Sequence, residues 1–292
     1  MNGYLLVFAA AVLWGLIGVF SQGILDAGVG ALEIAFWRAA LAGALFAAHA
    51  RLTGQLKLAG ARDFGALAAF AGVGVTLFYA AYTLAVQTGG VSLASLLLYS
   101  APAFVALAAW ALLGEALTLS KLGLLALTLV GVALVSQGGG EGVRVGPASL
   151  FWGLVAALAY ASYYIFGKWV LARYAPVTIY AVVLPIGALG LLPLVTFAPK
   201  TPSVWGLLLL LAAVSTYAAY GLYYTGLKRV EASRAVLVAS VEPVVAALLA
   251  ALLFGERLGA WGLLGGAAIL GAAVLASLPA RAARSPQPGD LA

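Results

Sequence analysis

Two charged residues inside long apolar stretches of this chain could bind an ion or a polar ligand. Glu242 precedes Pro243 near the middle of the run SVEPVVAALLAALLFGERL, which begins at Ser240. Proline cannot donate the backbone hydrogen bond that continues a helix, so this carboxylate lies beside a local break and could bind an ammonium group or a proton. The structural alternatives are a protonated carboxyl group and an ion pair with Arg38.

Arg38, in the run AFWRAAL, is the other deep charge. Its guanidinium could bind a carboxylate ligand, form an ion pair with Glu242 or Glu33, or extend its long apolar stem toward a polar surface. We expect structural pairing, and we therefore treat Arg38 as a structural charge.

Tyrosines supply the remaining chemistry. Many occur deep in apolar runs at spacings that place them on shared helix faces: Tyr79 and Tyr82; Tyr160, Tyr163 and Tyr164; and Tyr217, Tyr220 and Tyr224. A hydroxyl in an apolar environment lacks a partner, whereas around a pocket the rings would favour an aromatic or amine ligand. We predict a cavity lined by Glu242, Tyr82, Tyr99, Tyr163, Tyr79, Tyr220, Trp14 and Ser240.

Other site chemistries have little support in the sequence. The chain has no cysteine and one histidine, so thiolate sites and His-rich metal sites are not expected. Its glycine-rich segments lack the strand–turn–helix context and the basic residue of a phosphate-binding loop. We expect no metal and no cofactor. The basic residues are scattered over short loops, which argues against nucleic acid as a partner.

The composition indicates a membrane protein. The chain has 292 residues, of which 65% are hydrophobic and only 8% are charged, whereas soluble domains carry about 25% charged residues. The apolar runs are long and unbroken, which favours helices of about 20 residues over the short alternating strands of a barrel. We expect an all-α polytopic protein with ten transmembrane helices at about 3–22, 31–50, 64–86, 91–112, 119–137, 147–168, 177–197, 204–227, 232–253 and 259–278.

The distribution of basic residues predicts the orientation. With ten spans, one side of the membrane receives Arg51, Lys57, Arg62, Lys121, Lys168, Arg173, Lys228, Arg229, Arg234, Arg281 and Arg284, and the other receives Arg144, Lys200 and Arg257. Cytoplasmic loops carry the excess of Lys and Arg. Both termini of this multi-pass protein are therefore expected in the cytoplasm.

The chain nearly repeats itself after 141 residues (243 − 102). This shift superimposes Pro102 on Pro243, Gly114 and Glu115 on Gly255 and Glu256, and Tyr79 and Tyr82 on Tyr220 and Tyr223. Two five-helix halves must enter the membrane in opposite senses because five is odd, and inverted repeats are a recurring design of secondary transporters. We predict a first repeat at 1–140, an inverted second repeat at 141–278 and a disordered cytoplasmic tail at 279–292. The predicted hinges are Pro102, Pro243, Gly89 and Gly90.

In the paired motif, a Gly-Glu pair follows a proline, with the glutamate thirteen residues after it, and this motif resembles that of EamA-type transporters of the drug/metabolite transporter superfamily. The aromatic first helix of each half and the ten-span count add to the likeness, which covers residues 3–278. Within the superfamily the chain is most similar to bacterial aromatic amino acid exporters. The resemblance implies a multi-pass protein of the bacterial inner membrane that exports small metabolites through a central cavity near the fourth and ninth helices. One departure is that Arg257 follows the second Gly-Glu, but Ala116 follows the first.

The leading hypothesis is a secondary transporter that exports small amphipathic metabolites, amino acids and aromatic ones among them, by alternating access. Its expected partners are a small-molecule substrate, the lipid bilayer and, as an open alternative, protons; it would act as a monomer or homodimer. A membrane enzyme acting on a lipid-like substrate would need clusters of His, Asp or Glu. A passive channel would need polar rings along a pore. Both alternatives lack these features in the sequence, and we expect no enzymatic activity.

Overall fold

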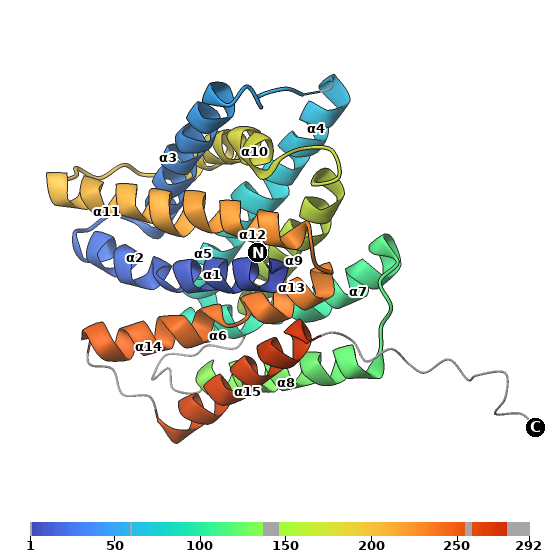
Figure 1. Cartoon of the computed structure of the whole chain (residues 1–292). Helices are drawn as coiled ribbons and strands as arrows, with labels where there is room; N and C mark the ends of the chain where they lie inside the picture. Colours follow the sequence, from blue (N-terminus) through green and yellow to red (C-terminus); the bar gives the residue numbers. More distant parts are fainter. Residues whose placement is uncertain (1, 59, 137–145, 255–258, 279–292) are drawn as a thin grey trace, which may run out of the picture.

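The computed structural model describes residues 2–58, 60–136, 146–254 and 259–278, and every regular element in these ranges is helical (Figure 1). Within the described ranges, eight helical segments are long and apolar enough to cross a membrane, and shorter apolar helices lie at Ala101–Leu113 and Leu119–Leu134. An all-α, multi-pass architecture is therefore confirmed. The predicted boundary between the repeats at 140 and 141, the Gly255-Glu256-Arg257 motif and the tail at 279–292 lie outside the described residues.

The first part of the chain forms α1 (Gly3–Gly15), α2 (Ile17–Asp26), α3 (Ala31–Leu52), α4 (Ala61–Phe70), η1 (Ala71–Leu77), α5 (Phe78–Gly89), α6 (Val91–Leu98), α7 (Ala101–Leu113) and α8 (Leu119–Ser136). The second part forms α9 (Pro147–Val170), α10 (Pro176–Leu191), η2 (Leu192–Leu194), α11 (Pro202–Ala212), η3 (Ala213–Ala218), α12 (Ala219–Leu227), α13 (Ala232–Ala239), α14 (Glu242–Phe254) and α15 (Ala260–Ser277). These bounds follow the apolar runs of the sequence closely.

Four helix pairs make the most extensive contacts: α3 with α10, α8 with α15, α5 with α9, and α1 with α12. Figure 1 shows α8 and α15 together at one side of the bundle and α3 and α10 at the opposite side, with α1 between them. Each pair joins an element of the first part of the chain to an element of the second. The two parts are therefore interlocked rather than separate.

Small residues permit some of these close approaches. A Cβ atom added to Gly43 of α3 would lie 2.8 Å from the ring of Pro185 in α10. A Cβ atom added to Gly187 of α10 would lie 2.5 Å from the Cβ of Val75 in η1. Membrane helices associate mainly through such packing, because lipid offers no hydrophobic gain for bringing them together.

Both expected helix breaks are present. The helix α6 ends at Leu98 and α7 begins at Ala101, and α13 ends at Ala239 while α14 begins at Glu242. Pro102 and Pro243 each occupy the second position of the new helix, where the missing N–H costs no helical hydrogen bond. The two breaks are therefore positioned alike relative to their prolines.

Gly89 and Gly90 form the turn between α5 and α6. The helix α5 ends at Gly89, and Gly90 has a φ of 86°. Glycine adopts this backbone conformation readily, because it has no Cβ atom. The turn is therefore tight, and the hinge role of these residues stays a prediction.

Two helices contain a wide, π-helical turn that the sequence did not predict. The segment η1 joins α4 to α5, and η3 joins α11 to α12. Subtracting 141 from the bounds of η3 gives 72–77, which lies within η1. Such turns are rare in proteins as a whole, and those that do occur often lie at functional sites.

A charged cluster joins the two parts of the chain at one end of the bundle. The Glu115 carboxylate accepts the backbone N–H groups of Ala232 (2.8 Å) and Ser233 (3.2 Å) at the start of α13, and the Ser233 hydroxyl also donates to it. Lys121 lies 3.7 Å from Glu115 and 3.1 Å from Glu231. A negative charge at a helix N-terminus is stabilising, so Glu115 caps α13 from another helix's end.

A second ion pair lies in a different part of the bundle. The Lys200 ammonium pairs with Glu33, whose side chain is 1% exposed, and Glu33 also accepts the backbone N–H of Ala198 at 3.0 Å. The rings of Trp37 and Trp205 lie 5.4 and 5.5 Å from the Lys200 nitrogen. Glu33 is thus satisfied without Arg38.

Candidate functional site

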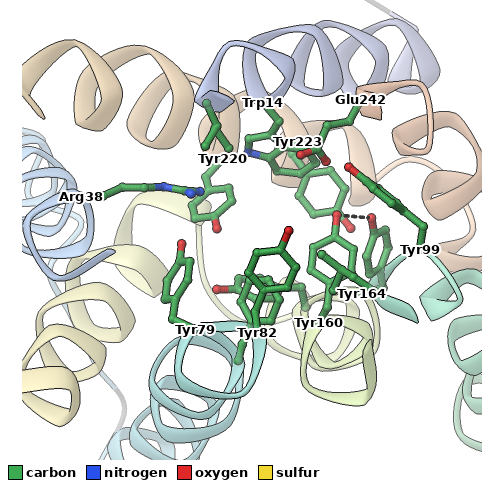
Figure 2. Close-up of a pocket in the computed structure, with 14 residues that line it drawn as sticks. Trp14, Arg38, Tyr79, Tyr82, Tyr99, Tyr160, Tyr164, Tyr220, Tyr223 and Glu242 are labelled. Atoms are coloured by element: carbon green, nitrogen blue, oxygen red, sulfur yellow. Dashed lines mark hydrogen bonds between the residues drawn. The ribbon is translucent and has the colours of Figure 1, made fainter. Parts of the chain in front are cut away.

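A cavity of about 190 Å³ lies where α1, α3, α5, α9, α12 and the two helix breaks meet. Fourteen residues line it: Trp14, Ile17, Arg38, Phe78, Tyr79, Tyr82, Leu98, Tyr99, Tyr160, Tyr163, Tyr164, Tyr220, Tyr223 and Glu242. Figure 2 shows their side chains converging from several helices, with tyrosine rings on most sides. The cavity is therefore aromatic, with one cationic and one anionic group.

The structure brings together seven of the eight cavity residues expected from the sequence: Glu242, Tyr82, Tyr99, Tyr163, Tyr79, Tyr220 and Trp14. Ser240 lies apart from this lining. It is 4% exposed, and its hydroxyl donates to the backbone carbonyl of Val236 at 2.9 Å. That bond satisfies the hydroxyl within its own helix.

The guanidinium of Arg38 points into the cavity from α3 (Figure 2). Its Nε donates to the Oγ1 of Thr216 at 2.8 Å, and its central carbon lies 5.5 Å from the ring centroid of Tyr79. Among the described residues, Arg38 forms no ion pair with either Glu242 or Glu33. The structure thus places Arg38 on the cavity wall, without the ionic partners that the sequence suggested.

Glu242 is the first residue of α14 and is half-buried on the cavity wall. Figure 2 shows the Tyr99 hydroxyl directed toward its carboxylate, and the two groups interact. Arg38 attracts the carboxylate from a greater distance. The N-terminus of α14 adds a favourable dipole for a negative charge.

The tyrosine rings form a continuous packed shell. Tyr180 stacks on Tyr220 at 4.6 Å between centroids, and Tyr163 lies 5.9 Å from Tyr220. The hydroxyls of Tyr160 and Tyr164 are 3.2 Å apart, and the dashed line in Figure 2 marks this bond. Aromatic pairs at such distances contribute about 0.5–1.5 kcal/mol each beyond the area that they bury. This shell is a rigid, apolar surface for a flat ligand.

Three polar atoms of the lining are buried and have no hydrogen-bond partner in the part of the chain that the structure describes: Trp14 Nε1, Tyr163 OH and Tyr223 OH. Buried polar atoms in proteins are paired in the large majority of cases. The concentration of such atoms around one cavity suits a ligand that carries polar groups as well as an apolar body. The same condition holds for Tyr180 OH and Ser215 Oγ, which lie outside the lining.

The sequence reasoning missed Tyr160, Tyr164, Tyr223, Phe78, Ile17 and Leu98 as lining residues, and it did not place Arg38 in the cavity. A signal existed for Tyr223, because it is the counterpart of Tyr82 under the 141-residue shift. Tyr160 and Tyr164 were visible as a pair on one helix face. No sequence signal distinguished Phe78, Ile17 and Leu98 from the many other apolar residues.

Comparison with known proteins supplies a family. The model of the EamA-like transporter family matches residues 1–137 and again residues 147–278. An uncharacterized transporter of Archaeoglobus fulgidus is 32% identical over 200 residues, which cover 68% of this chain and 72% of that protein. The uncharacterized inner membrane transporter YicL of Salmonella typhimurium is 28% identical over 96% of both chains. A crystal structure shares the fold with a TM-score of 0.81 at 19% identity, covering 94% of this chain and 96% of that one.

Proposed function

Because this chain belongs to the EamA-like transporter family, we propose that it is a secondary transporter that exports amino acids, aromatic ones included, across the bacterial inner membrane. The observation that carries the proposal is the central cavity. Its tyrosine shell suits an apolar side chain, and Glu242 offers a carboxylate to an amine. The adjoining helix breaks add backbone carbonyls that could accept from the same amine.

We propose the ten-span inverted arrangement, with repeats at 1–140 and 141–278 and both termini in the cytoplasm. Two features support it. The family model matches the chain twice, once in each half. The extensive helix contacts also join spans that are equivalent in the two repeats. The contact of α3 with α10 joins the second span to the seventh, and the contact of α8 with α15 joins the fifth to the tenth. The contact of α5 with α9 joins the third span to the sixth, and the contact of α1 with α12 joins the eighth span to the first. Each contact is the equivalent of the other when the repeats are exchanged, as a two-fold axis requires.

Alternating access would follow from this arrangement. The breaks before Pro102 and Pro243 divide two helices that border the cavity, and the Gly89-Gly90 turn leads into one of them. Helix halves on either side of a break can move with less loss of hydrogen bonding than a continuous helix. Opposite tilting of the two halves would open the cavity to one side of the membrane and then to the other.

The test is flux in proteoliposomes that contain the purified protein. We expect saturable counterflow of labelled phenylalanine, reduced by some unlabelled amino acids in a competition panel and not by others. Glu242→Gln should lower that flux at least about tenfold, because a charge-assisted hydrogen bond to the amine is lost. Glu231→Gln is the matched control, since Glu231 is 47% exposed and remote from the cavity lining.

Other outcomes would replace the proposal. Non-saturable ion conductance would indicate a channel, and turnover of a bilayer lipid would indicate an enzyme. Absence of flux for every amino acid in the panel would refute the substrate class. Equal flux by wild type and Glu242→Gln would remove Glu242 from the mechanism.

A further inference from the structure

We propose that Arg38 and Glu242 form a two-point clamp for the zwitterion of an α-amino acid, with Arg38 binding the carboxylate and Glu242 the ammonium group. This inference rests on the proposed transport function and assigns Arg38, which the sequence suggested as a structural charge, to substrate recognition. It also orders the substrate in the cavity, with the apolar side chain against the tyrosine shell.

A hydrogen bond at the Nε edge of its guanidinium fixes the orientation of Arg38. Its Nε donates to Thr216 Oγ1 at 2.8 Å. Among the described residues, the guanidinium of Arg38 makes no other hydrogen bond. Its two terminal nitrogens therefore remain available on the cavity wall. A guanidinium presents donors in a planar fork that matches a carboxylate with two parallel hydrogen bonds.

Thr216 can serve only as an acceptor toward Arg38. Its own hydroxyl proton is directed to the carbonyl of Leu211 at 3.2 Å, five residues earlier in the chain. Thr216 is 1% exposed and lies in the π-helical segment η3. The wide turn thus supplies a buried oxygen with a fixed polarity, which holds the arginine in one orientation.

The opposite charge lies elsewhere on the same cavity wall. Figure 2 shows Arg38 and Glu242 entering the cavity from different sides, and no ion pair joins them. A buried Arg38 and a half-buried Glu242 that do not meet are costly, because each charge is partly desolvated without a full partner. A ligand with both charges would resolve this for both residues.

An α-amino acid carries its two charged groups at a short, fixed separation. Its nitrogen and carboxyl carbon are about 2.5 Å apart by standard backbone geometry. Charge-assisted hydrogen bonds of about 2.8 Å at each end extend that reach beyond the separation of a direct ion pair. The apolar side chain would then face the rings of Tyr163 and Tyr220, where the unpaired Tyr163 hydroxyl can meet a polar substituent.

The experiment uses three unlabelled competitors against labelled phenylalanine flux in proteoliposomes. Phenylalanine has both charged groups, phenylalanine amide lacks the carboxylate, and 3-phenylpropionate lacks the ammonium group. In wild type, we expect phenylalanine to compete at least about tenfold better than either analogue, since one charge-assisted contact is lost each time. This comparison needs no variant, so it stands even where a substitution prevents folding.

The variants then assign each end of the clamp. Arg38→Gln should abolish the preference for phenylalanine over its amide while keeping the preference over 3-phenylpropionate. Glu242→Gln should do the reverse. Arg38→Lys keeps the charge without the fork, and should retain only part of the preference over the amide.

Thr216→Val tests the positioning role of the threonine. It should raise the KM for phenylalanine and weaken the preference over the amide, without altering the preference over 3-phenylpropionate. Thr225→Val is the matched control, because among the described residues the Thr225 hydroxyl bonds only to the carbonyl of Gly221 within its own helix. That variant should leave both preferences unchanged.

Failure of the clamp and failure of the proposed function give different results. Saturable phenylalanine flux with equal competition by all three compounds would overturn the clamp and leave transport intact. Equal loss of both preferences in Arg38→Gln would also overturn it, because a structural arginine would not separate the two ends. Absence of saturable amino acid flux in wild type would instead refute the proposed function.

Discussion

Glu115 provides a quantitative test of how the two parts of the chain are held together. Its side chain is 10% exposed, and it accepts two backbone N–H groups and a hydroxyl at the start of α13. Glu115→Ala leaves both N–H groups without this acceptor. Each unsatisfied group costs about 1–3 kcal/mol, so the loss of the acceptor for both should lower the free energy of unfolding by about 2–6 kcal/mol.

Glu231 is the matched control for this substitution. It shares Lys121 as an ionic partner with Glu115, at 3.1 Å, and also lies 3.2 Å from Arg234. Its side chain is 47% exposed, however, so solvent screens both pairs. Glu231→Ala should therefore cost no more than about 1 kcal/mol.

The assay is reversible unfolding by sodium dodecyl sulfate in mixed micelles, followed by tryptophan fluorescence. The comparison between the two variants is more informative than either value, because both remove one carboxylate near the same lysine. If the two variants lost equal stability, hydrogen bonding to α13 would contribute nothing beyond charge. That result would refute the assignment of Glu115 as the cap of this helix.

Two further substitution pairs test packing and the cavity. Gly187→Ala should destabilise the protein by about 1–3 kcal/mol in the same unfolding assay, because the new Cβ would lie 2.5 Å from Val75. Gly221→Ala should be neutral or gain up to about 1 kcal/mol, since nothing lies within 4 Å of its added Cβ; equal losses would contradict this packing. Tyr180→Phe and Tyr163→Phe each remove a buried hydroxyl without a partner, so neither should lower stability. Only Tyr163→Phe should weaken the competition of unlabelled tyrosine against labelled phenylalanine, because Tyr163 lines the cavity, where its hydroxyl can bond to the phenol of tyrosine, and Tyr180 does not.

The helices and their interruptions were predictable because they depend on local chemistry. Long apolar runs must satisfy their backbone groups internally, and this fixed most helix bounds to within a few residues. Proline at 102 and 243 indicated both breaks, since a residue without an N–H cannot continue a helix. The 141-residue repeat also predicted that the tyrosine pairs of the two halves lie the same number of residues before their helix breaks.

The partners of the charged residues were not predictable, because they depend on contacts between distant parts of the chain. Arg38 bonds to Thr216, which is 178 residues away, and Glu33 pairs with Lys200. Ser240 illustrates a different error, in which a residue was predicted to line the cavity and does not. Its polar side chain suggested a place in the lining, but a serine within a helix can satisfy itself on a carbonyl of the preceding turn.

The wide turns η1 and η3 have a consequence for where the tyrosines point. Each residue of an α-helix advances the side-chain direction by about 100°, so one additional residue in a turn re-aims everything that follows by more than a quarter of a circle. Tyr79 follows η1 and Tyr220 follows η3, and both face the same interior space. If Ala213–Ala218 were wound as a regular α-helix instead, the side chains of α12 would be rotated away from the cavity, although the helix would still be long enough to cross the bilayer. The width of this one turn therefore decides which side chains of α12 face the cavity.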